Sequence, residues 1–309
     1  MKTIRQTLST CFLTPYDFEF KSMTQMPLDR EEYIEQTYFF RNYRERLEDA
    51  IPSQVVLSTI FEEVLATTKL PMAIDFLKGE LMLTGRISDG MEKLSHYFTP
   101  FQTYIMKNAE DDKSKFDQKI ALKILEREAK YRTENPSSAG MFIYQFECIS
   151  RNRLGYHHGL EAISRDTQYN TDWSEWIRKL KQQLGSVDFA DLIYLRSQHF
   201  VDEQRKRPGN AEFQPRYPVL FSSQDGRIAK ANHNRDPLYM FGALQRQLGY
   251  PEVPRNLPQT GKSVFHPALE ARLHKIEARL QLIDSELKGN LDLNQFMVKD
   301  VKFEDLDPK

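Results

Sequence analysis

The densest group of side chains that could do chemistry lies between residues 147 and 165 of this 309-residue chain. Two adjacent histidines beside arginines and a tyrosine could supply an acid–base pair or a site for an anion. The alternative is a solvated helix surface with intrahelical ion pairs, because adjacent residues on a helix point in different directions. The candidate catalytic residues are Glu147, Arg153, Tyr156, His157 and His158, with Arg151, Glu161 and Arg165 nearby.

Other motifs argue against a bound metal or cofactor. His158-x-x-Glu161 and His199-x-x-Asp202 reverse the Glu-x-x-His order of di-iron bundles. Gly261-Lys262-Ser263 has the form of the end of a phosphate-binding loop, but Asn256 stands where that loop needs its first glycine. Two cysteines, Cys11 and Cys148, form no zinc-ligand set. We therefore predict no metal and no cofactor.

The charge balance and hydropathy exclude several classes of partner. Lysine and arginine together number 43, and aspartate and glutamate number 44. The chain therefore lacks the global positive field typical of nucleic-acid binders. No segment approaches the roughly 18 consecutive apolar residues of a membrane span, and the N-terminal stretch lacks the apolar run of a signal peptide. We predict a cytoplasmic protein with no nucleic-acid partner and no membrane contact.

Helical spacing of apolar residues dominates the sequence up to about residue 206. Gly85 is expected to end one helix, and Thr99-Pro100 to cap the next. Apolar residues then continue at mostly three-, four- and seven-residue steps, which predicts one helix as far as Tyr131, bent near the charged run 110–115. Ser186 should cap another helix that reaches Lys206. The break at 135–140 separates two helical groups.

One segment predicts strands. Residues 217–221 and 227–231 are rich in apolar side chains and flank Asp225-Gly226, a dipeptide favoured in tight hairpin turns. We therefore predict a small β-hairpin near 217–231. Asp236-Pro237 should then cap a helix that ends at Gly249.

The most specific pattern is a heptad seam in residues 267–287. Its six apolar residues are separated by four, three, four, three and four positions and have charged flanks, as in a coiled coil. The expected partner of this helix is the protein's own body, a second copy in a homodimer, or another protein. The predicted interaction residues are Leu269, Leu273, Ile276, Leu280, Ile283 and Leu287.

These elements predict a mainly α fold, a multi-helix bundle in two helical groups with one small hairpin and a C-terminal coiled-coil-like helix. The predicted parts are an N-terminal arm (1–27), a first helical group (28–135), a second helical group (136–206), the hairpin with a short helix (207–258), and the heptad helix with an acidic tail (259–309).

Several segments between Tyr38 and Pro254 resemble an uncharacterised family of bacterial soluble helical proteins. They are Leu70–Leu77, Leu94–Phe101, and the stretches Asp236–Tyr239 and Leu248–Pro251. The resemblance implies a bacterial cytoplasmic protein. The family has no assigned activity, so it supplies no functional residues.

The combined features favour a non-enzymatic helical interaction or scaffold protein, because the heptad seam is present and recognised catalytic signatures are absent. The alternative is an enzyme or small-ligand-binding protein whose polar site lies near Arg153, Tyr156, His157 and His158. That alternative predicts a concave site where these side chains converge.

Overall fold

The computed structural model describes residues 27–111, 113–114, 116–255, 276 and 279–280. Thirteen α-helices are found in this part of the chain, which contains isolated β-bridges but no strands. The predicted mainly α fold is confirmed. The chain divides into two compact units, 1–256 and 257–309, and the description below concerns the first. The division of the body into helical groups near residue 135 stays a prediction.

The helices are short to medium in length, and most follow one another with brief connections; the longest connection, 206–222, joins α11 to α12. Their bounds are α1 Arg30–Glu48, α2 Ser53–Glu63, α3 Leu70–Thr84, α4 Ile87–Lys93, α5 Pro100–Ala109, α6 Gln118–Arg132, α7 Ser138–Arg151, α8 Tyr156–Ser164, α9 Thr171–Gln183, α10 Phe189–Tyr194, α11 Gln198–Arg205, α12 Ser223–Ala231 and α13 Pro237–Leu248.

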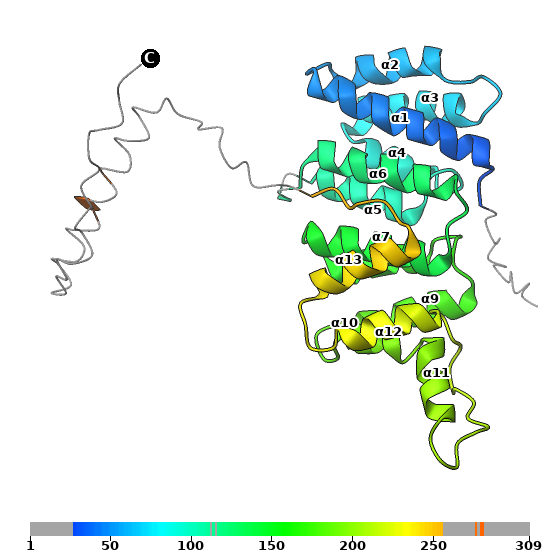
Figure 1. Ribbon diagram of the computed structural model, residues 1–309. Coiled ribbons are helices and arrows are strands. Elements are labelled where there is room, and N and C mark those ends of the chain that lie inside the picture. The colour runs from blue at the N-terminus through cyan, green and yellow to red at the C-terminus, as the bar shows by residue number, and fades with distance from the viewer. Residues whose placement is uncertain (1–26, 112, 115, 256–275, 277–278, 281–309) are drawn as a thin grey trace, which may run out of the picture. The chain divides into compact units, whose positions relative to one another are not determined.

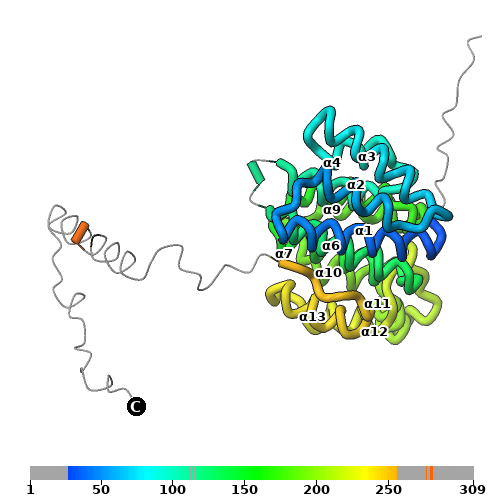
Figure 2. The backbone as a smooth tube through the Cα atoms, turned by 90° about the horizontal axis from the view of Figure 1, so that it is seen from above, coloured from blue at the N-terminus to red at the C-terminus, as the bar shows by residue number. Residues whose placement is uncertain are grey.

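Within residues 27–255 the helices stack in successive layers (Figure 1). The helix α2 lies at one end of the stack beside α1 and α3; α4, α5 and α6 follow, then α7 with α13, and α11 lies at the far end. Seen from above, α3 and α4 lie along one side and α11 to α13 along the other (Figure 2). Most helices therefore pack only against their neighbours in the stack.

Local sequence signals set many of the helix ends. Thr99 caps α5 in a reciprocal box: its hydroxyl accepts from the Gln102 amide, and the Gln102 side chain accepts from the Thr99 amide. Gly85 and Gly249 end α3 and α13 in the left-handed region, with φ of 76° and 70°. These three ends agree with the prediction.

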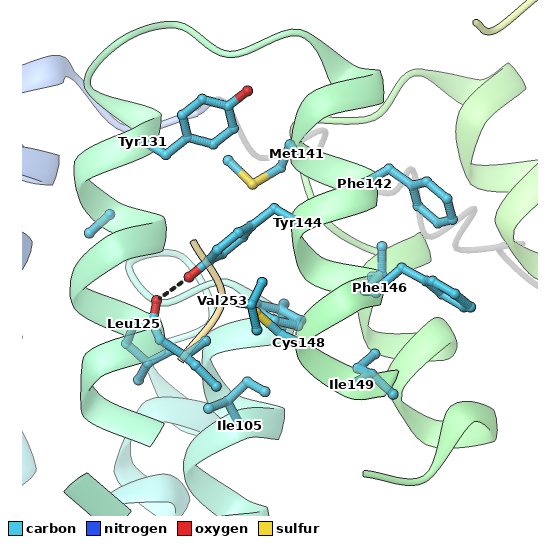
Figure 3. Close-up of a cluster of buried hydrophobic side chains, with 14 of the residues drawn as sticks. Ile105, Leu125, Tyr131, Met141, Phe142, Tyr144, Phe146, Cys148, Ile149 and Val253 are labelled. Atoms are coloured by element: carbon cyan, nitrogen blue, oxygen red, sulfur yellow. Dashed lines mark hydrogen bonds between the residues drawn. The ribbon is translucent and has the colours of Figure 1, made fainter. Parts of the chain in front are cut away.

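The core is organised around α7, which is buried on nearly every side. A helix that is apolar all round must lie inside a protein or a membrane, and here neighbouring helices cover it. The Tyr144 hydroxyl donates to the carbonyl oxygen of Ile124 in α6, 2.9 Å away (Figure 3). No helix in the described ranges combines the length and the apolar character needed to cross a membrane.

A charged network is buried where α6, α7 and the segment after α8 meet. The Arg132 guanidinium, 1% exposed, donates to the carboxylates of Glu128 (2.8 Å) and Asp166. The Gln145 amide donates to the same two carboxylates, and the Tyr169 hydroxyl donates to Gln145. Burial alone would lower the pKa of Arg132, but the carboxylates of Asp166 and Glu128 raise it well above its usual value. Arg132 therefore stays charged.

The predicted hairpin near 217–231 is wrong. Residues Ser223–Ala231 form α12, and Asp225-Gly226 lies in its first turn. Ser222 and Asp225 make a capping box that satisfies the helix N-terminus. Phe221 instead forms a single bridge with Ser197. The dipeptide that favours a hairpin turn is here part of a helix start.

Two predicted long helices are each divided in two. The helix expected from Pro100 to Tyr131 ends at Ala109, because the Glu110 carboxylate accepts the amides of Ile87 and Ser88 at the start of α4, both at 2.8 Å. The helix expected to reach Lys206 is interrupted, and Ser197 caps its second part, α11.

The predicted heptad helix lies almost wholly outside the described residues. Ile276 and Leu280, together with Arg279, are in helical conformation. The other four residues of the predicted seam lie outside the described residues: Leu269, Leu273, Ile283 and Leu287. Residues 1–26 of the predicted N-terminal arm also lie outside them. The coiled coil therefore stays a prediction.

Candidate functional site

A concavity among the described residues is lined by residues of α4, α5 and α8, and is called here the α5–α8 groove. Its volume is about 860 Å³. Tyr104 fixes the two helices against each other, because its hydroxyl donates to the carbonyl oxygen of Gly155 at 2.8 Å. Gly159 permits the close approach: a methyl group there would lie 2.5 Å from Ile149 Cδ1 and 3.2 Å from the Tyr104 ring. The main polar lining residues are Arg86, Glu92, Lys107, His158, Glu161 and Arg165.

Both signs of charge line the groove, and several of these charges are paired. Glu161 accepts hydrogen bonds from Arg165 (2.7 Å) and Lys181 (3.4 Å). The hydrogen bond from Arg165 lowers the pKa of Glu161 below its usual value. Lys107 Nζ of α5 lies 3.5 Å from a carboxylate oxygen of Glu92 in α4. A groove with this lining can form ion pairs and hydrogen bonds with a small polar molecule.

The structure separates the candidate catalytic residues. Glu147 is buried in α7, where Arg151 donates to one carboxylate oxygen and the Tyr250 hydroxyl lies 2.6 Å from the other. Arg153 is exposed beyond the end of α7, with φ of 55°. Glu147 therefore serves the packing of the C-terminal segment of the body.

The other candidates lie at the exposed start of α8. Tyr156 stacks on Phe146, with ring centroids 5.7 Å apart, and donates to Ser150 Oγ. The rings of His157 and His158 meet edge to face at 5.1 Å. Of the five candidates, His158 lines the α5–α8 groove. Tyr104 and Lys107 were not predicted, since no sequence spacing relates residues of α5 to residues of α8.

A cluster with metal-binding atoms joins α10 to the turn after α12. One atom each from Asp188, Asp191 and His233 lies within 4.8 Å of the others. His233 Nδ1 is 2.8 Å from Asp191 Oδ1, and the two oxygens of Asp188 accept the amides of Ala190 and Asn234. These hydrogen bonds alone account for the arrangement, which closes the start of α10 against the turn.

The described cysteine offers no nucleophile. Cys148 is a free thiol, fully buried in α7. Burial raises the pKa of this thiol well above its usual value, which disfavours the reactive thiolate.

A second surface feature is an exposed apolar face at the end of the stack, called here the α2–α3 face. Along α3, Met72 is 78% exposed, Phe76 38% and Leu83 81%. Met82 (67%) and Val55 of α2 (52%) lie along a shallow groove of about 660 Å³ between the two helices. Single exposed apolar residues are ordinary, but a contiguous row of them is typical of an interaction surface.

Comparisons with protein-family models, with curated proteins and with solved structures find no match for this chain. The resemblance to a bacterial helical family therefore stays a prediction, and the candidate sites rest on their geometry.

Proposed function

We propose that this chain works in the cytoplasm as a non-enzymatic helical interaction or scaffold protein, and that the α2–α3 face is a surface on which a partner docks. The observation that carries the proposal is the row of apolar side chains along α3, with Met72 and Leu83 about four-fifths exposed. A terminal layer that served only to close the stack would be polar outside, as capping layers are. Amphipathic helices bind grooves of this kind through anchors at helical spacing.

Two further points support the proposal. The candidate catalytic residues do not meet: Glu147 is buried against Tyr250, whereas His157 and His158 are exposed on α8. The heptad seam predicted at 267–287 would provide a second contact, either to another copy or to another protein.

A photo-cross-linking amino acid at position 83 tests the proposal in cells that express the full chain. We expect an adduct with one identified polypeptide, and we expect Met72→Asp to abolish it while circular dichroism stays unchanged. Position 179 on α9, where the Lys179 side chain is 56% exposed, is the matched control and should yield no adduct. The proposal is wrong if position 83 yields no adduct, or a scatter of adducts that Met72→Asp does not affect.

The α5–α8 groove favours a second candidate, the binding of a small polar molecule that carries both charges. Its paired lining, Lys107 with Glu92 and Arg165 with Glu161, matches such a molecule. Free amino acids are suitable probes: bound ligand raises the unfolding temperature, and a rise that His158→Ala and Lys107→Ala do not reduce would eliminate this candidate.

A further inference from the structure

We infer that the body contains a further ligand site, a polar pocket that takes a small neutral molecule with several hydroxyl groups, such as a sugar or a sugar alcohol. The pocket is called here the Tyr43 pocket, and its volume is about 510 Å³. Its wall is formed by residues from α1, the start of α2, the end of α3, the start of α4 and the end of α5. The inference goes beyond the proposed function, because none of the exposed apolar side chains of the α2–α3 face lines this pocket.

The observation that carries the inference is an unpaired hydroxyl group on Tyr43 in the pocket wall. Tyr43 is 1% exposed, and its hydroxyl has no hydrogen-bond partner in the part of the chain that the structure describes. Burial raises the pKa of Tyr43, and the Glu110 carboxylate adds to this rise, which Ser53 only partly offsets. The hydroxyl therefore keeps its proton and is a donor without an acceptor.

Tyr43 differs in this respect from other tyrosines that are buried in the body. Five of them donate their hydroxyl hydrogen to an oxygen of the fold: Tyr97, Tyr131, Tyr144, Tyr169 and Tyr250. Folded proteins pair nearly all their buried polar groups, because an unpaired one keeps the full cost of leaving water. An unpaired donor that borders a polar cavity therefore indicates an acceptor from outside the chain.

The wall of the pocket presents donors and acceptors side by side. Tyr43 and Arg86 donate, whereas the Glu110 carboxylate accepts: each of its oxygens receives one amide of α4 at 2.8 Å and keeps further acceptor capacity. The Ser53 hydroxyl and the Gln118 amide each offer both a donor and an acceptor. A ligand that fits this wall must therefore donate and accept at neighbouring positions.

A hydroxyl group meets this requirement, because it has one donor hydrogen and two acceptor lone pairs. A phosphate offers mainly acceptors and would face the carboxylates of Glu110 and Asp111, whereas an ammonium group offers only donors and would face Tyr43 and Arg86. Apolar side chains form a minor part of the wall, so an apolar ligand would leave its polar groups unpaired. A polyhydroxylated molecule therefore suits the pocket best.

The Tyr43 pocket adjoins the α5–α8 groove, because Arg86 and Asp111 line both concavities. Tyr43 lines the pocket but not the groove, and Lys107 lines the groove but not the pocket. Variants of Tyr43 and Lys107 therefore distinguish the two sites.

Isothermal titration calorimetry of the full chain with D-ribose, D-glucose, myo-inositol and sorbitol, each at millimolar concentration, tests the inference. We expect saturable binding of at least one of them, which Tyr43→Phe weakens by at least about tenfold because the ligand loses a hydrogen-bond donor. Tyr144→Phe removes a hydroxyl that is just as buried but already donates to the carbonyl oxygen of Ile124. This control should leave the affinity unchanged, and so should Lys107→Ala.

Thermal unfolding adds a readout that a merely structural role of Tyr43 would not give. Without ligand, Tyr43→Phe should unfold at the temperature of the wild type or above it, since the lost hydroxyl had no partner, whereas Tyr144→Phe should unfold at a lower temperature. The bound compound should raise the unfolding temperature of the wild type and of Tyr144→Phe, but not that of Tyr43→Phe. A loss of stability in ligand-free Tyr43→Phe overturns the inference, because the hydroxyl would then be paired within the fold.

Three further outcomes overturn the inference. If none of the four compounds binds, the pocket holds only water. If one binds with the same affinity to Tyr43→Phe, its site lies elsewhere. If inorganic phosphate, spermidine or glycine binds in a way that Tyr43→Phe abolishes while the four compounds do not bind, the ligand is charged. None of these outcomes alters the cross-linking expected at position 83, so the docking function is tested separately.

Discussion

Arg132 is a single residue on which three segments depend. Its guanidinium sits between Glu128 and Asp166 with less than 2% of any of the three side chains exposed. A buried ion group of this kind adds little compared with a well-packed apolar core, but removing one partner leaves charges without compensation. The network is therefore a point where one substitution has a large effect.

We predict that Arg132→Met lowers the free energy of unfolding by about 3–5 kcal/mol, because two carboxylates are left buried without their cation. Arg165→Met is the matched control: Arg165 also pairs with a glutamate four residues away, but 64% of its side chain is exposed, so the loss should stay below about 1 kcal/mol. Urea unfolding of both variants measures the difference. Equal losses of unfolding free energy in the two variants would show that burial of the network does not cause the destabilisation by Arg132→Met.

At the scale of the elements, Gly226 allows α12 to pack closely against the start of α11. A methyl group at this position would overlap Ser197 Oγ and lie 2.5 Å from Ser197 Cβ and 2.8 Å from His199 Cβ. The close approach joins α12 to the start of α11. Glycine is thus required by packing between helices, whereas the sequence analysis assigned it to a hairpin turn.

We predict that Gly226→Ala destabilises the fold by about 1–3 kcal/mol through overpacking, although alanine is the better helix former by about 1 kcal/mol. Gly242→Ala in α13 is the control, since its nearest contact would be Arg246 Nη1 at 3.9 Å, the end of a flexible side chain. Thermal unfolding should show opposite shifts for the two variants. A stabilised Gly226→Ala would contradict the described packing of α11 and α12.

The helix ends that the sequence predicted are those with a local cause. Thr99 with Pro100, Gly85 and Gly249 act through their own backbone and neighbouring amides. The errors have causes distant in sequence. The Glu110 carboxylate accepts hydrogen bonds from the amides of Ile87 and Ser88, and α5 ends just before this residue. The apolar periodicity within 100–131 cannot predict this contact, because its partners lie outside that segment.

The candidate site shows the same limit. The sequence analysis identified His158, Glu161 and Arg165, which belong to α8 and its C-terminal end. It grouped them with Glu147 because a sequence shows the spacing of residues along one helix but not the contacts between helices. The groove forms where α8 meets α5, and Gly159 and Tyr104 govern that contact. Tertiary packing also separated Glu147, which Tyr250 reaches from 103 residues away.

At the scale of the whole body, the extended segment Tyr250–Pro254 follows α13 and runs along α6 and α7 (Figures 1 and 3). Asn152 donates to the carbonyl oxygen of Pro254 at 3.0 Å, and Arg127 donates to that of Glu252. Burial and the Glu147 carboxylate raise the pKa of Tyr250, so its hydroxyl stays protonated and can donate. The segment thus connects α6, α7 and α13.

We predict that Tyr250→Phe lowers the free energy of unfolding by about 1.5–3 kcal/mol, because a buried carboxylate loses a hydrogen-bond donor. Tyr239→Phe, the same change at a residue 74% exposed, should have no measurable effect. Hydrogen exchange adds spatial detail: amides of α7 and α13 should lose protection together in Tyr250→Phe. Loss confined to residues after 250 would mean that the segment does not hold these helices together.

The α2–α3 face also determines how the protein responds to oxidants. Met72 and Met82 expose their thioethers on this face, whereas the methionines at 91, 106, 141 and 240 are buried. Peroxide would therefore reach the first two when the face is uncovered and convert each to a polar sulfoxide. This apolar face would become more polar while the buried methionines stayed unchanged, and methionine sulfoxide reductases could restore it.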